Sequence, residues 1–465
     1  MDSNIVNKII SYFPEVRKPE QKKLDFKSKL KWTLMILLSF FILSNIPLFG
    51  LGENSLSQFR QLSIILGASF GSILSLGIGP IVTSSIVLQL LVGSGILKLD
   101  MTTHDGRTFF QGLQKILTIF FILFEATVYV MLGGLAPHAS FAGTPNYFMF
   151  QLILIIQLII GGLLILYMDE VISKWGFGSG VSLFIAAGVS AEIFIRAFSP
   201  LNSIGGLSFG SGQPPVGAIL VFFTSLLAGA PREALIAAVA VIATVVVFII
   251  SVYAQAMKVE IPLSYGRVRG FGVRWPLNFL YASNIPVILI AALLANVQLG
   301  ATFLLTKGII SATAGNSIIA WVAGPPIVTN ILTGSFVYMD VFRALFYMLV
   351  LAFGSVLFSV FWVKTAGMDA ESQARQIRAA GLSIAGFRTD QRILEKVLSR
   401  YIFPLTVMGG LFVGIIAASA DLLGALSRGT GILLAVMIIY KLYEDIARQH
   451  MMDMHPALRK MMGGE

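Results

Sequence analysis

The chain has 465 residues, a mean hydropathy of +0.84 and only 12% charged residues, a composition that excludes an ordinary water-soluble globular protein. It indicates a polytopic membrane protein, because apolar runs of about 20 residues cross the ~30 Å hydrocarbon layer as helices. The net charge is +10, and the absence of cysteine excludes disulfides and thiolate metal sites.

Ten apolar runs predict ten membrane-spanning helices, five before residue 215 and five after it. They are placed at 31–49, 76–96, 112–134, 147–167, 181–199, 236–256, 284–299, 336–363, 402–420 and 429–447. Three other apolar runs are interrupted by glycine or proline and are predicted as partial or re-entrant segments: 57–75, 216–228 and 309–333. The even division permits two halves related by an inverted pseudo-repeat, residues 31–215 and 216–447.

Lysine and arginine predict the orientation. Most of the 33 basic residues fall on one side, in the segment 1–30, the loops 257–276 and 364–401, the tail 448–465 and shorter connections. Basic residues are retained on the cytoplasmic side, so both termini and both long loops are predicted to be cytoplasmic in a multi-pass protein of the cell membrane. Loops of this length predict a docking partner, although a topology signal alone would explain their charge.

The first residues predict a short interfacial helix within the cytosolic segment. Ile5, Ile9 and Phe13 are spaced by four, which suits a helix lying flat on the membrane surface. The alternative is a frayed tail with a chance pattern.

Motifs for catalysis are missing from the sequence. It has no Walker nucleotide loop, and His104, His138, His450 and His455 form no zinc-protease pattern. The glycines of GFGSG at 176–180 indicate a flexible turn, because the strand and helix needed around a dinucleotide site are missing. We therefore predict no catalytic residue, no cofactor and no metal.

Two kinds of residue stand out within the spans. Ile78 and Val82 are four residues apart on one helical face, as are Val181 and Ile185, and each pair has glycine nearby. Ordinary packing, in which small residues let helices approach, accounts for such pairs without a function.

Polar residues within the spans are few. Glu125 lies well inside the third span, where a carboxyl group is costly and is a functional candidate. Thr83 and Asn296 are further polar residues in apolar runs. Interhelical hydrogen bonding is the structural alternative for all three.

Longer motifs are distributed over the whole chain. They are LGIGPIVTSSIVLQLLVGSGI (76–96), YMDEVISKWGFGSGVSLFIAAGVS (167–190), VEIPLSYGRVRG (259–270), FLYASNIPVILIAALLANVQ (279–298), GFR (386–388), YIFPLTVMGG (401–410), GTGILL (429–434) and HPA (455–457). With these motifs the chain resembles the SecY/Sec61α family of protein-conducting channels, in its archaeal form.

The resemblance implies an all-α polytopic fold, with ten transmembrane helices in two pseudo-symmetric inverted halves around a central hourglass pore with a plug. Six apolar side chains at matching positions would form a ring at the narrowest point: Ile78, Val82, Val181, Ile185, Ile288 and Leu434. The plug would lie near 53–72 and include Leu62, Ile64, Ile65, Leu66 and Gly67. A narrow apolar ring resists wetting and so excludes ions.

The resemblance also implies a lateral gate and partners. Thr83, Glu125 and Asn296 match polar positions whose hydrogen bonds would hold the gate to lipid shut until the apolar core of a signal peptide replaces them. Four arginines match cytosolic loop positions that engage the ribosome: Arg267, Arg269, Arg388 and Arg392. Ribosomal RNA is a polyanion, which suits exposed arginine. Two small single-span subunits, of the SecE/Sec61γ and SecG/Sec61β kinds, would complete the complex.

The implied function is the central subunit of a translocation channel, which passes unfolded secretory polypeptides across the membrane and releases transmembrane segments sideways into lipid. The alternative is a secondary transporter with inverted repeats, which would be expected to show paired intramembrane charges. An intramembrane protease would need a nucleophile dyad or an aspartate pair at depth, and the sequence offers no convincing candidate.

Overall fold

The computed structural model describes residues 14–20, 24–54, 69–93, 96–97, 99, 103–131, 133–141, 143–144, 146–202, 206, 208, 214–265, 272–282, 285–306, 308–379, 382–384 and 391–454. Each of the ten predicted spans overlaps a helix in these ranges. The ten helices are α2 (Phe26–Ser44), α4 (Gly79–Gly93), α5 (His104–Met131), α6 (Asn146–Trp175), α7 (Gly180–Phe198), α9 (Pro231–Ala256), α10 (Ile285–Thr306), α13 (Tyr338–Thr365), α15 (Gln391–Leu423) and α16 (Gly429–Met454).

Seven helices in the described part of the chain, α5, α6, α7, α9, α10, α13 and α15, are long and apolar enough to cross a membrane. The other three helices, α2, α4 and α16, are too short or too charged at one end to meet this criterion. Helix α2 carries Lys27, Lys29 and Lys31 in its first turns, α4 has 15 residues, and α16 becomes charged toward its end. The first span begins at Phe26, several residues before its predicted start, because the three lysines are followed directly by the apolar run.

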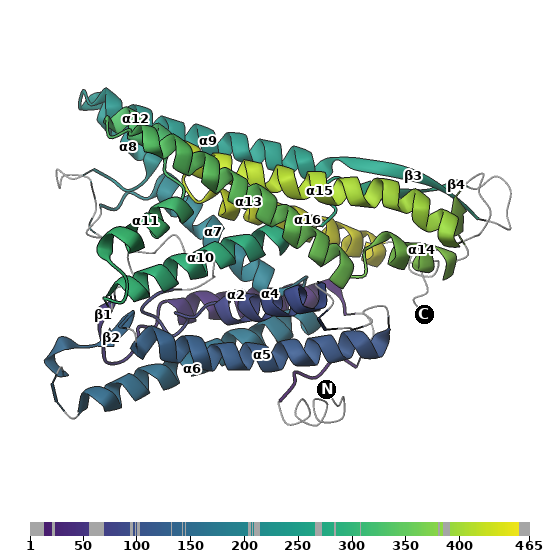
Figure 1. Cartoon of the computed structure of the whole chain (residues 1–465), viewed down its shortest axis with the longest axis horizontal. Coiled ribbons are helices and arrows are strands. Elements are labelled where there is room, and N and C mark those ends of the chain that lie inside the picture. The colour runs from purple at the N-terminus through teal and green to yellow at the C-terminus, as the bar shows by residue number, and fades with distance from the viewer. Residues whose placement is uncertain are drawn as a thin grey trace.

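The shorter apolar runs form short helices. Residues 216–228 contain α8 (Ala218–Leu227), and residues 309–333 contain α11 (Ala312–Val322) and α12 (Ile327–Thr333). A strand pair, β1 (Leu51–Asn54) with β2 (Leu135–Pro137), and a 3-10 turn, η2 (Ala139–Phe141), lie between the first spans. Figure 1 shows α8, α11, α12 and the β1–β2 pair at one end of the helical bundle.

The two long basic loops are joined to each other at the opposite end of the bundle (Figure 1). The first loop forms a hairpin of β3 (Lys258–Tyr265) and β4 (Gly272–Asn278). The second contains α14 (Ala370–Ala379) and β5 (Leu382–Ile384), and β5 pairs antiparallel with β3. These strands were not predicted, although apolar and more polar residues alternate in β3 and β4. The reason is that a strand needs a partner, and β5 is only three residues long and more than 100 residues from β3.

Most helices before residue 215 and most helices after it lie on opposite long sides of the bundle in Figure 1. Helices α2, α4, α5 and α6 run along one long side, and α9, α13 and α15 run along the other, with α10 between them. The largest buried apolar cluster draws on both groups, from Phe40 of α2 to Leu351 of α13 and Met437 of α16. The hydrophobic core therefore lies between the two groups of helices.

The segment 14–20 is fastened to α5 and to the last turns of α6. Glu170 of α6 forms ion pairs with Lys115 of α5 and with Lys174, and its carboxylate also accepts a hydrogen bond from the Val16 backbone N–H at 3.1 Å. Lys174 pairs with Glu15 at 2.6 Å. The hydrogen bond from Lys174 holds the pKa of the Glu15 carboxyl below its usual value. Glu170 is therefore the centre of a clamp between the N-terminal segment and two helices.

Replacing Glu170 by alanine is expected to lower the melting temperature of the detergent-solubilised protein. The change leaves Lys115 and Lys174, whose side chains are only 14% and 15% exposed, without this partner. We expect a loss of about 1–3 kcal/mol. The matched control is Glu371→Ala, which breaks the exposed pair with Arg375 at 3.4 Å and should change the melting temperature little. Equal melting temperatures for the Glu170 variant and the parent would show that the clamp contributes nothing.

Candidate functional site

Five of the six apolar residues of the predicted ring lie near the starts of α4, α7, α10 and α16, and Ile78 lies directly before α4. Ile78, Ile185 and Leu434 are fully buried, and Val82 and Ile288 are 4% and 5% exposed. These five belong to one buried apolar cluster, and Val181 packs against it. The structure thus brings together side chains from four separate parts of the sequence.

The approach to α4 is shaped by close packing on α6. The Gly71 backbone N–H donates to the Ser75 hydroxyl at 2.9 Å, which stabilises the turns that lead to Ile78. These turns lie directly against α6 at Gly161, where an added Cβ would be 1.9 Å from the carbonyl oxygen of Ile73. Only glycine permits this contact, so Gly161 helps to set the position of Ile78.

Two other helix starts are anchored by carboxylates. The Val181 backbone N–H donates to Oδ1 of Asp169 on α6 at 2.9 Å, and the Gly429 N–H donates to Oδ1 of Asp421 on α15 at 2.6 Å. The first N–H groups of a helix have no partner within the helix, and a negative group there also interacts favourably with the helix dipole. The first turns of α7 and α16, which carry ring residues, are therefore fixed to neighbouring helices.

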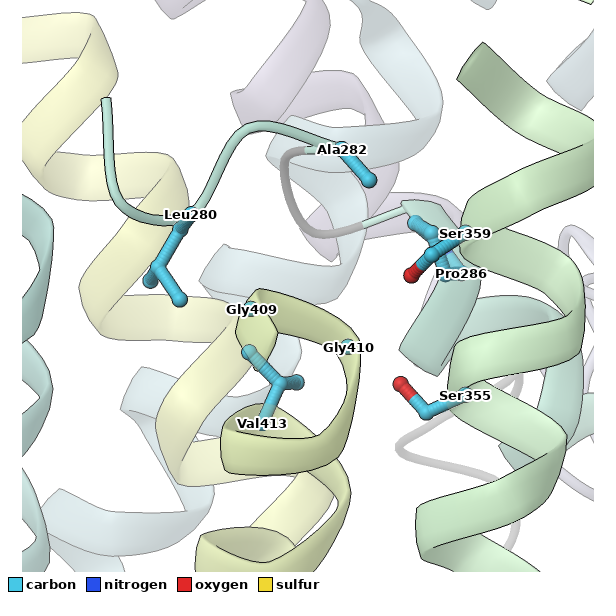
Figure 2. A pocket seen from close by; sticks show the side chains of 8 residues that line it. All are labelled: Leu280, Ala282, Pro286, Ser355, Ser359, Gly409, Gly410 and Val413. Carbon is cyan, nitrogen blue, oxygen red and sulfur yellow. The ribbon is translucent and has the colours of Figure 1, made fainter. Parts of the chain in front are cut away.

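The start of α10 lies beside two other helices. Figure 2 shows a small pocket beside Pro286, between α13 and α15. Its lining includes Ser355 and Ser359 of α13, whose side chains lie toward Gly409 and Gly410 of α15. The Ser355 hydroxyl is buried and has no hydrogen-bond partner. The pocket is small, and the next residues of α10, Val287 and Ile288, are buried.

The three polar residues of the predicted gate lie together on α4, α5 and α10. The Asn296 side-chain amide of α10 donates to Thr83 Oγ1 of α4 at 3.4 Å. The same Thr83 hydroxyl donates to Glu125 Oε1 of α5 at 3.3 Å. Thr83 is therefore the common member of the set, which we call the polar seam.

Two further bonds, which the sequence analysis missed, join α4 to α5. The hydroxyls of Ser84 and Thr118 are hydrogen-bonded at 2.7 Å, and the Gln114 amide donates to Ser85 Oγ at 2.6 Å. The sequence pattern could have predicted these contacts, because the polar residues 114, 118 and 125 are spaced by four and seven and so share one face of the helix. These bonds make α4 and α5 one unit.

Apolar contacts continue the junction of α5 with α10. The rings of Tyr129 and Phe303 are 5.9 Å apart, and both belong to a second buried cluster that also includes Ala126 and Leu299. The contact between α5 and α10 is thus apolar along this part, whereas the polar seam joins α10 to α4.

Several predicted residues lie outside the described residues. They are the interfacial segment with Ile5, Ile9 and Phe13, the plug residues Leu62, Ile64, Ile65, Leu66 and Gly67, and Arg267, Arg269 and Arg388. Arg392 is described, in the first turn of α15, and is exposed. The described residues contain no group of three or more His, Asp or Glu side chains that could hold a metal ion.

Comparison with known proteins extends these observations. The SecY family model matches residues 72–443, and the model described as the plug domain of Sec61p matches residues 39–71. The chain is 46% identical to the protein translocase subunit SecY of Methanothermobacter thermautotrophicus, over 98% of both chains. The plug match starts inside α2, earlier than the predicted plug near 53–72.

Two solved structures have the same fold. One is described as the structure of a protein conducting channel, with a TM-score of 0.80, 38% identity and coverage of 97% of this chain and 99% of the other. The second is Sec61 in the canine ribosome-channel complex from the endoplasmic reticulum, with a TM-score of 0.77, 38% identity and the same coverage. With the family model and a relative similar over the full length, these matches show that the chain is a multi-pass membrane protein that belongs to the SecY family.

Proposed function

We propose that this chain is the channel-forming subunit of a protein translocation complex in the cell membrane, which conducts unfolded secretory polypeptides and releases transmembrane segments into lipid. The observation that carries the proposal is the burial of Ile78, Ile185, Ile288 and Leu434, from four helices, in one apolar cluster. The relative named protein translocase subunit SecY, which matches over the full length, supports the same function.

The proposed constriction works by remaining dry. Its members are the six ring residues from Ile78 to Leu434, and a gap lined only by branched aliphatic side chains disfavours water and hydrated ions. A threaded polypeptide displaces these side chains without breaking hydrogen bonds. The segment around Leu62–Gly67 would rest against the ring as the plug when no polypeptide is present, which the match of residues 39–71 to a plug-domain model supports.

The proposed lateral gate lies where α4 and α5 meet α10. Thr83, Glu125 and Asn296 form the polar seam, and its bonds at 3.3 and 3.4 Å are long for hydrogen bonds that involve side-chain oxygens. The apolar helix of a signal peptide would replace these contacts on its way to lipid. The free-energy difference between the closed and open seam is therefore small, as a switch requires.

The proposed ribosome contact is the end of the bundle formed by the two basic loops. The β4–β3–β5 sheet holds both loops together, so that Arg267 and Arg269 follow β3 while Arg388 follows β5. The Sec61 structure in the ribosome-channel complex supports this partner. In this orientation both termini are cytoplasmic, and small subunits of the SecE/Sec61γ and SecG/Sec61β kinds accompany the chain.

Ribosomes that carry a secretory nascent chain are expected to sediment with vesicles containing the complex, and the nascent chain to become protected from protease. Binding should fall steeply with salt, because arginine contacts to ribosomal RNA release counterions. The Arg267→Glu/Arg388→Glu variant should lose most binding and protection, whereas the control Arg232→Glu, which reverses an exposed charge in the first turn of α9 outside both loops, should retain both. Vesicles that bind no ribosomes, protect no polypeptide and accumulate a small solute would show a transporter instead.

A further inference from the structure

A buried polar contact joins α7 to the connection that precedes α16. Glu192 of α7 is 7% exposed, and its Oε2 accepts a hydrogen bond from the Ser427 hydroxyl at 2.5 Å, although the two residues are 235 positions apart. One turn later, Arg196 forms an ion pair with Glu192 at 3.0 Å and donates from Nη1 to the carbonyl oxygen of Leu426 at 3.1 Å. We call these four residues the α7–α16 latch.

The same connection is also held by α9 and α15, and α13 supports the α15 contact. The Leu426 backbone N–H donates to Thr244 Oγ1 of α9 at 2.9 Å. Asp421 of α15 accepts from the Gly429 N–H, as described above, and its Oδ2 accepts from the Tyr347 hydroxyl of α13 at 2.5 Å. Residues 426–429 are thus fastened on several sides, so a contact made to them is transmitted directly to the first turn of α16.

Contacts between α7 and α16 follow one register. Ile185, Val189 and Glu192 are separated by four and three residues and share one face of α7. Opposite Glu192 lies Ser427, and opposite Val189 lies Gly431, where an added Cβ would be 3.2 Å from Val189 Cγ2. Residue numbers rise along α7 as they fall along α16, so the helices run antiparallel.

One more turn in this register brings Ile185 to the level of Leu434. Both residues are fully buried members of the same cluster. Seven residues separate Glu192 from Ile185, which is about 10 Å along α7, and seven separate Ser427, just before α16, from Leu434. The latch is therefore outside the proposed constriction but in rigid connection with two of its members.

We propose that Glu192 and Ser427 are positioning residues, which fix the register of α7 against α16 and so keep Ile185 and Leu434 opposite each other. The inference rests on the proposed constriction. Its physical basis is the cost of leaving buried polar groups unpaired: a slip of one turn would remove the Ser427 hydroxyl from Oε2 of Glu192 and the Leu426 carbonyl from Arg196, and only the Glu192–Arg196 pair within α7 would remain. The apolar contacts of Ile185 and Leu434 do not by themselves specify a register, because aliphatic side chains pack in many ways.

Crosslinking measures the register directly. The chain has no cysteine, so an Ile185→Cys/Leu434→Cys pair in the complete complex can be joined by an oxidant or a short bifunctional reagent without background. The crosslinked fraction should fall several-fold when Glu192→Ala or Ser427→Ala is added. The exchange Glu192→Ser/Ser427→Glu restores a carboxylate and a hydroxyl across the same contact, and it should recover most of the crosslink. Glu192→Gln keeps the bond to Ser427 and should give an intermediate yield.

The matched control is Asp340→Ala on α13. Asp340 is 6% exposed, pairs with Arg343 at 3.4 Å and accepts from Asn330 of α12 at 3.2 Å, so its loss resembles that of Glu192 in burial and charge. It should lower thermal stability without changing the crosslink. An unchanged crosslink in a folded Glu192→Ala complex overturns the proposal.

Ion conductance of the closed complex separates this proposal from the constriction itself. A lower crosslink together with higher conductance in Glu192→Ala supports both. A lower crosslink with unchanged conductance supports the register and overturns the assignment of Ile185 and Leu434 to the ion barrier. The two ideas therefore fail in different measurements.

Discussion

Replacing Ile78 and Ile185 together by glycine is expected to raise the ion conductance of the closed channel several-fold in planar bilayers that contain the reconstituted complex. Both side chains are fully buried, Ile78 directly before α4 and Ile185 in α7, and both lie in the cluster that contains Ile288 and Leu434. Their removal widens an apolar gap and lowers the cost of wetting it. Conductance is therefore the direct measure of the proposed barrier.

The double substitution also destabilises the protein, by about 2–5 kcal/mol per site for loss of the side chain and about 1 kcal/mol for glycine in a helix. Alanine at both positions is the milder variant and should give a smaller rise. Leu154→Gly/Leu158→Gly on α6 is the matched control, because both leucines are fully buried but belong to the other apolar cluster. Wild-type conductance in the alanine and glycine variants, with the complex intact, would place the barrier elsewhere.

The spans could be predicted from the sequence because each depends on a local property. An apolar run long enough to cross the bilayer must satisfy its backbone internally, so it forms a helix whatever its neighbours are. Charges at the ends blur the limits, as the lysines before residue 32 do for α2. The largest difference is in α15, which begins at Gln391, well before the predicted span 402–420. Its first turns lie outside the apolar run and pack against α14.

The structure of the two basic loops could not be predicted from local sequence alone. Their length and charge indicated a docking surface, but nothing in residues 382–384 alone predicts a strand. That strand exists because β3 offers an open edge, with Leu263 opposite Ile384 and Tyr265 opposite Leu382. Pro276 is tolerated in β4, since this strand is at the edge of the sheet. Pairing between distant segments determines the structure of both loops.

In the candidate site, too, the sequence identified individual residues but not the contacts between them. The residues Thr83, Glu125 and Asn296 were identified through a resemblance, and their polarity within apolar runs marked them as unusual. Their hydrogen-bond partners could not be predicted from local sequence, because the bonds link positions 42 and 213 residues apart. The latch of Glu192 with Ser427 was not identified at all, since a single glutamate next to an arginine on α7 reads as an ordinary local ion pair.

The polar seam and the α7–α16 latch differ in strength. The seam joins α4 to α10 through one hydrogen bond at 3.4 Å between partly buried groups. The latch joins α7 to the connection before α16 through two shorter bonds, from the Ser427 hydroxyl to Glu192 at 2.5 Å and from Arg196 to the Leu426 carbonyl oxygen at 3.1 Å. If the helices before and after residue 215 separate, the weaker junction parts first. We therefore expect the seam to open while the latch holds.

Replacing Asn296 by alanine is expected to let weaker signal sequences open the gate. The change removes the bond between α10 and α4 and adds no apolar area that could compensate. A hydrogen bond between membrane helices contributes about 0.6 kcal/mol on average, so the ratio of open to closed gate should rise about threefold. Secretory reporters with signals of graded apolarity measure the effect, and export should begin at a lower apolarity than in the parent.

The bonds between α4 and α5 make the effect of Glu125→Ala smaller than that of Asn296→Ala. Without Glu125, α4 remains joined to α5 by the bonds of Ser84 and Ser85, and Asn296 can still donate to Thr83. Thr127→Ala is the control on α5, because this exposed hydroxyl bonds only to the carbonyl oxygen one turn earlier. The expected order of the shift in threshold is Asn296→Ala, then Glu125→Ala, then Thr127→Ala. Parental export of weak-signal reporters by the Asn296 variant would show that the polar seam does not hold the gate.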